Sequence, residues 1–132
     1  MLDRALQQRI APAIEGIARG LVRRGVGANQ LTLAGFTIGI AAAVLIALQL
    51  YLAALALMLL SRLCDGLDGA VARATRPTDV GGFLDIALDF LFYAAIPLGF
   101  AFADPARNAL AAATLLAAFA GTMSSFLAFA VL

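Results

Sequence analysis

The run from residue 31 to residue 50 contains no charged side chain. Coiled as an α-helix, a run of this length spans about 30 Å, which matches the hydrocarbon thickness of a bilayer. The whole chain is 64% hydrophobic and 13% charged, whereas soluble domains are roughly half apolar and a quarter charged. These features predict an integral membrane protein.

We expect an all-α fold with four transmembrane helices, which form one domain over residues 25–132. The expected spans cover about residues 31–50, 51–72, 81–103 and 109–132. Asn29 can cap the first of them, and Thr78 or Asp79 can cap the third. Pro77 disfavours helix at the residue before it and so marks the end of the second span.

Residues 1–24 carry apolar side chains at steps of three and four, which is the helical period. These side chains are Leu2, Leu6, Ile10, Ile14, Ile17 and Leu21. Five arginines occupy the other faces. A basic amphipathic helix of this kind is typical of one that lies in the membrane surface, and an ordinary solvated helix is the alternative.

Four carboxylates fall within or beside the apolar segments, where ionisable groups are costly and usually functional. Asp65 and Asp68 are three residues apart, and Asp85 and Asp89 are four apart, so each pair shares one face of its helix. Like charges brought this close repel one another unless a cation neutralises them. Oxygen ligands of this type favour Mg²⁺ or Mn²⁺. Histidine is absent and Cys64 is the single cysteine, which excludes imidazole and cysteine-cluster metal sites.

Arginine and glycine residues accompany the carboxylates. Arg73 has the forked donor geometry that suits phosphate, and Gly69, Gly81 and Gly82 leave room for a ligand. Together with a metal, this set favours transfer of a phosphorus group from a diphosphate donor. The net charge of +1 gives no basis for nucleic-acid binding. Two other readings stay open: a cation-binding or cation-conducting membrane protein, and charges that merely pair, Arg62 with Asp65 and Arg73 with Asp68.

The distribution of arginine predicts the orientation of the chain. Five arginines lie in the N-terminal segment and two in the 73–80 link, but the 49–52 turn has none and the 104–108 turn has one. Cytoplasmic segments carry the excess of positive charge. We therefore expect a multi-pass protein of the cell (inner) membrane, with the N-terminus and the acidic cluster on the cytoplasmic side.

The acidic segments also resemble a known family pattern. The pattern consists of Asp65-x-x-Asp68-Gly69-x-x-Ala72-Arg73, followed by Gly81-x-x-x-Asp85-x-x-x-Asp89. It resembles the motif of the CDP-alcohol phosphatidyltransferases. One departure is the spacer between Arg73 and Gly81, which is one residue shorter than the family pattern.

The resemblance implies a metal-dependent enzyme of phospholipid synthesis. Such an enzyme transfers a phosphatidyl or similar group from a CDP-linked lipid donor, such as CDP-diacylglycerol, to an alcohol acceptor and releases CMP. The residues that it assigns to metal binding are Asp65, Asp68, Asp85 and Asp89. Asp89 would also be the general base on the acceptor hydroxyl. The residues that it assigns to donor binding are Asn29, Gln30, Leu31, Thr32, Gly69, Arg73 and Thr78.

The resemblance further implies six transmembrane helices and a homodimer. Because this sequence supplies four apolar spans, we expect it to lack the last two, which contribute to the acceptor pocket. An inactive truncated relative is therefore a further alternative. The sequence does not identify the acceptor alcohol.

Overall fold

The computed structural model describes residues 2–130, and these residues form five helices and no strand. The helices are α1 (Leu2–Arg23), α2 (Ala28–Ala47), α3 (Tyr51–Ala74), α4 (Asp79–Ala103) and α5 (Pro105–Ala130). The expected all-α fold, with one N-terminal helix before four long ones, is confirmed.

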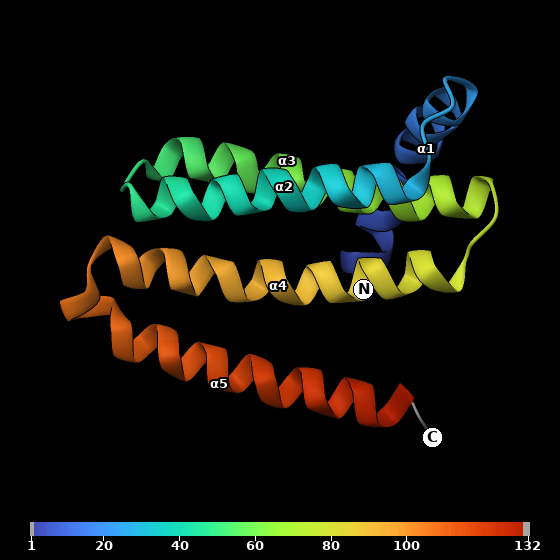
Figure 1. Cartoon of the computed structure of the whole chain (residues 1–132). Coiled ribbons are helices and arrows are strands. Elements are labelled where there is room, and N and C mark those ends of the chain that lie inside the picture. Colours follow the sequence, from blue (N-terminus) through green and yellow to red (C-terminus); the bar gives the residue numbers. More distant parts are fainter. Residues whose placement is uncertain (1, 131–132) are drawn as a thin grey trace.

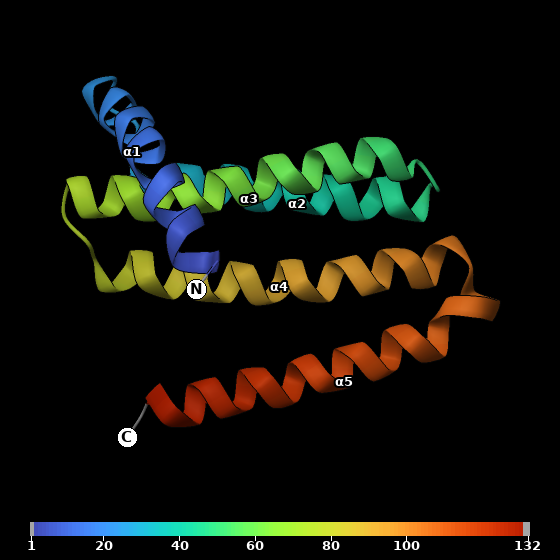
Figure 2. The same ribbon diagram turned by 180° about the vertical axis from the view of Figure 1, so that it is seen from behind.

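Helices α2, α3 and α4 run side by side, and α5 packs against the outer side of α4 (Figure 1). Helix α1 lies across one end of this bundle, where it contacts α3 (Figure 2). The α1–α2 connection and the α3–α4 link lie at that same end, and the two short turns lie at the other. At the far end, the Gln49 side-chain amide donates to the Ala103 carbonyl at 2.8 Å. The two arginine-bearing connections thus share one end of the bundle.

Glycines bring the three central helices close together. A Cβ built at Gly35 of α2 would lie 2.9 Å from the Cβ of Cys64 in α3. A Cβ built at Gly99 of α4 would lie 2.6 Å from the Ala43 carbonyl oxygen of α2. Ser61 of α3 is fully buried and donates to the Gly35 carbonyl at 2.8 Å. Small residues at such contacts are the usual means of packing helices in lipid.

Three helices, α2, α4 and α5, are long and apolar enough to cross a membrane. Helix α3 has the length, but it carries four charged residues, which are Arg62, Asp65, Asp68 and Arg73. It runs beside α2 along the bundle (Figure 1), and its role as the expected second span stays a prediction. Large apolar side chains such as Leu52, Leu110 and Phe129 point outward, as expected of lipid-facing residues.

The helix ends depart from expectation in two places. Helix α2 begins at Ala28, so Asn29 is not its cap; Gly27 is, and its N–H donates to the Gln30 side chain at 3.0 Å. Thr78 is confirmed as the cap of α4, because its hydroxyl accepts from the N–H of Gly81. Helix α5 begins at Pro105, four residues earlier than expected, because proline suits the first position of a helix. The expected end of the fourth span, residues 131–132, lies outside the described residues.

The N-terminal helix is continuous through Pro12. Its Ala18 is buried against Ala70 and Val71 of α3, with Ile14 and Leu21 packed around them. By contrast, Ile17 is half exposed. The part of the apolar stripe from Ile10 to Leu21 therefore divides between contact with α3 and an outward face, which an interfacial helix needs. Its placement in the membrane surface stays a prediction.

Candidate metal centre and adjoining cavity

Three of the four predicted metal ligands converge between α3 and α4. One carboxylate oxygen from each of Asp65, Asp68 and Asp85 lies within 4.8 Å of the other two. The helical spacing explains why Asp65 and Asp68 share one face of α3, and Asp85 meets them from α4. Asp68 is 4% exposed, so its charge is largely withdrawn from water.

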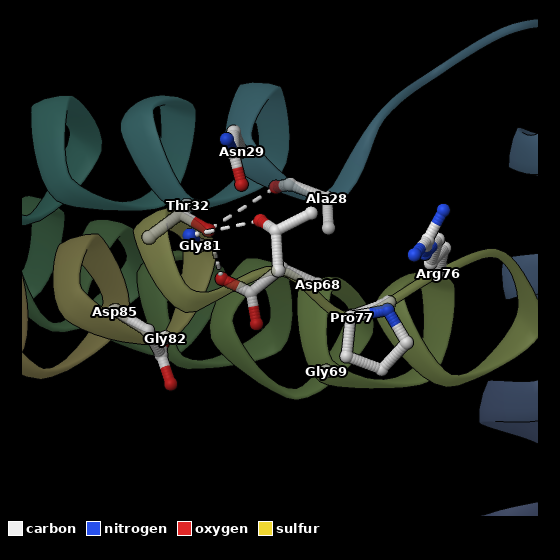
Figure 3. Close-up of a pocket in the computed structure, with 12 residues that line it drawn as sticks. Ala28, Asn29, Thr32, Asp68, Gly69, Arg76, Pro77, Gly81, Gly82 and Asp85 are labelled. Carbon is white, nitrogen blue, oxygen red and sulfur yellow. Dashed lines mark hydrogen bonds between the residues drawn. The ribbon is translucent and has the colours of Figure 1, made fainter.

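Thr32 of α2 holds Asp68 in place. Its hydroxyl oxygen lies 2.6 Å from Oδ2 of Asp68 and 3.1 Å from the Ala28 carbonyl. The shorter contact is a charge-assisted hydrogen bond that Thr32 donates to the carboxylate. Thr32 was expected to bind the CDP-linked donor; in the structure its hydroxyl supports the acidic cluster (Figure 3).

Asp89 lies next to the other three and is bound by an arginine. Nη1 of Arg62 donates to Oδ1 of Asp89 at 2.9 Å and lies 3.6 Å from Oδ2 of Asp65. If the charges merely neutralised one another, two ion pairs were expected, Arg62 with Asp65 and Arg73 with Asp68. The first of these ion pairs is present. Arg73 makes no ion pair with Asp68 among residues 2–130.

The charge balance fits a bound cation. Arg62 is the single cationic side chain in ion-pair contact with the four carboxylates in the part of the chain that the structure describes. Three negative charges are thus left without a protein counter-charge, and one of these carboxylates, Asp68, is buried, where an unpaired charge is costly. Asp65, Asp68 and Asp85 would be the residues that hold such a cation, each through one carboxylate oxygen. Hard oxygen ligands of this kind suit Mg²⁺ or Mn²⁺.

A cavity of about 160 Å³ adjoins Asp68 and Asp85 at the end of the bundle that carries the α3–α4 link. Residues of α2, α3, α4 and the link line it (Figure 3). Four of the expected donor-binding residues are among them, namely Asn29, Thr32, Gly69 and Thr78. A Cβ built at Gly81 would lie 3.0 Å from the Asn29 side chain, so glycine there keeps this end of the cavity open.

Three other expected donor-binding residues lie elsewhere. Gln30 bonds to the start of its own helix, and Leu31 packs against the contact between α1 and α3. Arg73 lines a separate cavity between α1 and α3, beside Arg19 and Glu15. A Cβ built at Gly69 would nevertheless lie 3.3 Å from Nη1 of Arg73, so its guanidinium borders the helix face that carries Gly69. The roles of these three residues stay predictions.

The structure places two further arginines at the site, neither of which the sequence analysis predicted as a site residue. Arg76, in the link, lines the cavity beside Asp68 and Asp85, and Arg62 contacts the acidic cluster. The charge of Arg62 inside an apolar segment was a usable signal for the second. For Arg76 the sequence offered only its place in a polar link.

Comparisons with known proteins find one family and several relatives. The profile of the CDP-alcohol phosphatidyltransferase family matches residues 26–132. Inner membrane protein YnjF of Escherichia coli (strain K12) is 58% identical over 132 residues, which is 100% of this chain and 64% of the relative. An archaetidylinositol phosphate synthase of Pyrococcus horikoshii is 36% identical over 97 residues, covering 73% of this chain and 52% of the relative.

A second archaetidylinositol phosphate synthase, from Methanothermobacter thermautotrophicus, is 42% identical over 78 residues, covering 58% of this chain and 40% of the relative. No solved structure matches the chain. The chain thus spans between 40% and 64% of the length of these curated relatives.

Proposed function

Because this chain belongs to the CDP-alcohol phosphatidyltransferase family, over residues 26–132, we propose that it transfers a phospho-alcohol group from a CDP-linked lipid donor to an alcohol acceptor. CMP is the leaving group, and the reaction is a step of phospholipid synthesis. The reaction depends on a divalent cation, Mg²⁺ or Mn²⁺.

The observation that carries this proposal is the convergence of Asp65, Asp68 and Asp85, with oxygens within 4.8 Å of one another, beside a cavity. A cation path needs the carboxylates but not the cavity lined by Gly69 and Arg76. A nucleotide diphosphate needs both, since its phosphates bind the cation and its other parts need space.

The aspartates of the site would have two different roles in the reaction. Asp65, Asp68 and Asp85 would hold the cation, which neutralises charge on the diphosphate and on the departing CMP. Asp89 accepts the proton of the acceptor hydroxyl, through the oxygen that does not bind Arg62. The hydroxyl oxygen then bonds to the phosphorus next to the lipid alcohol, and the bond from that phosphorus to the CMP oxygen breaks.

The cavity would hold the donor. Asn29 and Thr78 offer polar side chains there, and Gly69 lets the donor approach α3 closely. Arg76 supplies the positive charge of this cavity, and its forked guanidinium suits a phosphate. Arg73, at the edge of the same helix face, stays the residue that the family pattern favours for this contact.

The relatives suggest which acceptor to try first. Two of them are named archaetidylinositol phosphate synthases. An inositol phosphate is therefore the first acceptor to test, ahead of glycerol 3-phosphate, serine and phosphatidylglycerol. One relative is named an inner membrane protein, which supports a place in the cell membrane. The distribution of arginine is the basis for proposing that the cavity faces the cytoplasm. A homodimer stays a prediction from the family.

The direct test is CMP release by the purified chain in lipid nanodiscs. The protein is incubated with CDP-diacylglycerol or its archaeal ether analogue, each acceptor in turn, and Mg²⁺, Mn²⁺ or EDTA. We expect CMP release with at least one acceptor, and none with EDTA. The Asp65→Asn variant should lose at least about a hundredfold in rate, as expected for the loss of a metal ligand.

The alternatives predict other results. Donor binding without CMP release for any acceptor would show an inactive relative and reject the proposed transfer. Cation flux into liposomes that is abolished by Asp65→Asn, without any donor binding, would identify a cation path instead.

A further inference from the structure

Arg62 is the guanidinium inside the acidic cluster. It lies about half-way along α3 and contacts Asp89 at 2.9 Å and Asp65 at 3.6 Å. Its side chain is 32% exposed, and the side chain of Asp89 is 31% exposed, so the pair is partly withdrawn from water. Placing an arginine at this depth of an apolar helix is energetically costly, and residues of this kind usually have a function.

The fold holds Arg62 in one position. Its guanidinium carbon lies 4.1 Å from the ring centroid of Phe92 on α4, which is a cation–π contact. Phe92 is itself 3% exposed and packs against Gly39 of α2, where any Cβ would overlap the ring. The Nε of Arg62 is buried and has no hydrogen-bond partner among the described residues. The side chain of Arg62 is therefore fixed by packing and by its contact with Asp89, although not all of its donors form hydrogen bonds.

Asp89 needs such a support if it is the base. The last torsion of an aspartate is broad, so a carboxylate without a partner samples many orientations. Three other carboxylates stand nearby and repel it. The guanidinium of Arg62, bound to Oδ1 of Asp89, restricts the orientation of the carboxylate and offsets the repulsion. It leaves Oδ2 free to receive a proton.

We propose, on the basis of the proposed function, that Arg62 is a positioning residue for Asp89. It fixes the orientation of the base and balances its charge, and it acts on the transfer step. It does not line the cavity assigned to the donor. Its loss should therefore lower kcat while the KM for the donor is little changed.

The test compares Arg62→Met and Arg62→Lys with the matched control Arg107→Met. Arg107 also pairs with an aspartate three residues away, at 3.6 Å, but it is 87% exposed and lies at the far end of the bundle. We expect Arg62→Met to lower kcat at least about tenfold with the donor KM within about threefold, since an interaction made for the transfer step affects kcat alone. Lys can still donate to Asp89, so Arg62→Lys should recover part of the loss. Arg107→Met should match the wild type.

Two results would overturn the proposal: a kcat for Arg62→Met within twofold of the wild type, or a rise in donor KM at unchanged kcat. If the Met variant does not accumulate as folded protein, Arg62→Gln takes its place under the same criteria.

A second readout does not depend on turnover. Mn²⁺ affinity is measured by electron paramagnetic resonance for the wild type, Arg62→Met and the double variant Arg62→Met/Asp89→Asn. Released from Arg62, Asp89 is free to join the three carboxylates, so the single variant should bind Mn²⁺ about tenfold tighter. The double variant should lose most of that gain.

If the wild type releases no CMP, the proposed function fails together with any role of Arg62 in the transfer step, and this measurement decides only whether Arg62 pairs with Asp89. Unchanged Mn²⁺ affinity in the single variant, or an equal gain in the double variant, would then reject the pairing with Asp89.

Discussion

Thr32 illustrates how a single hydroxyl can organise a charged site. It donates to Oδ2 of Asp68 at 2.6 Å, and this carboxylate is 4% exposed. Thr32→Val keeps the shape and removes the donor. Partners that orient metal ligands typically contribute about 10–100-fold to metal affinity or activity. We expect the variant to bind Mn²⁺ about tenfold more weakly and to release CMP more slowly to a similar degree.

The control for this prediction lies on the same helix. Among the described residues, the Thr37 hydroxyl bonds only to the Leu33 carbonyl of its own helix, at 2.8 Å. Thr37→Val should therefore leave Mn²⁺ affinity and CMP release unchanged. Equal effects of the two substitutions would show that Thr32 acts through the helix backbone and not through Asp68.

At the residue scale, the sequence predicted the cluster but not all of its partners. The spacing of Asp65 and Asp68 on α3, and of Asp85 and Asp89 on α4, predicted that each pair shares one face, because helical geometry is local. That the two helices turn these faces toward each other depends on their packing. The contacts of Thr32 with Asp68 and of Arg62 with Asp89 join residues 36 and 27 positions apart. Such contacts depend on how whole helices pack, which no local pattern contains.

Among the elements, the close approach of α2 to α4 depends on Gly39. A Cβ at this position would overlap the ring of Phe92 and lie 3.0 Å from the Ser61 hydroxyl of α3. Gly39→Ala should therefore separate the helices and destabilise the protein by about 1–3 kcal/mol, as overpacking does. Because Phe92 supports Arg62, kcat should fall as well. Thermal unfolding in detergent and CMP release would measure the two effects.

Gly121 provides the matched control for that prediction. It lies within α5, and no atom outside its own helix backbone stands within 4 Å of a Cβ built there. Gly121→Ala should leave the stability unchanged or raise it by up to about 1 kcal/mol, because alanine favours the helix. A loss of stability in Gly121→Ala equal to that in Gly39→Ala would count against the overlap with Phe92 as the cause.

The helix ends show where sequence reasoning fails at this scale. Helix α3 continues to Ala74, so Arg73 is still helical and lies beside α1. Arg76 falls beyond the helix end and lines the cavity instead. A difference of two residues in a predicted helix end decides which arginine reaches the cavity, and helix ends are the least certain part of a prediction.

On the scale of the whole molecule, the two connections with most arginine share one end of the bundle. Sequence spacing predicted this arrangement, since an even number of spans between them returns the chain to the same side. The acidic cluster and its cavity open toward this end, because the cavity is lined by the start of α2 and by the α3–α4 link. The side of the membrane that this end faces follows from charge and stays a prediction.

Cysteine labelling in intact cells tests that orientation. In a Cys64→Ala background, single substitutions are made at one end, Arg24→Cys and Asp79→Cys, and at the other, Leu50→Cys and Ala106→Cys. The positive-inside rule predicts that a membrane-impermeant maleimide labels the second pair in spheroplasts, and the first pair only after permeabilisation. The reverse pattern would place the cavity outside, away from cytoplasmic CDP-linked donors, and would contradict the proposed function. Labelling of Asp79→Cys and Leu50→Cys from the same side would instead show that α3 does not cross the membrane, since these two positions flank it.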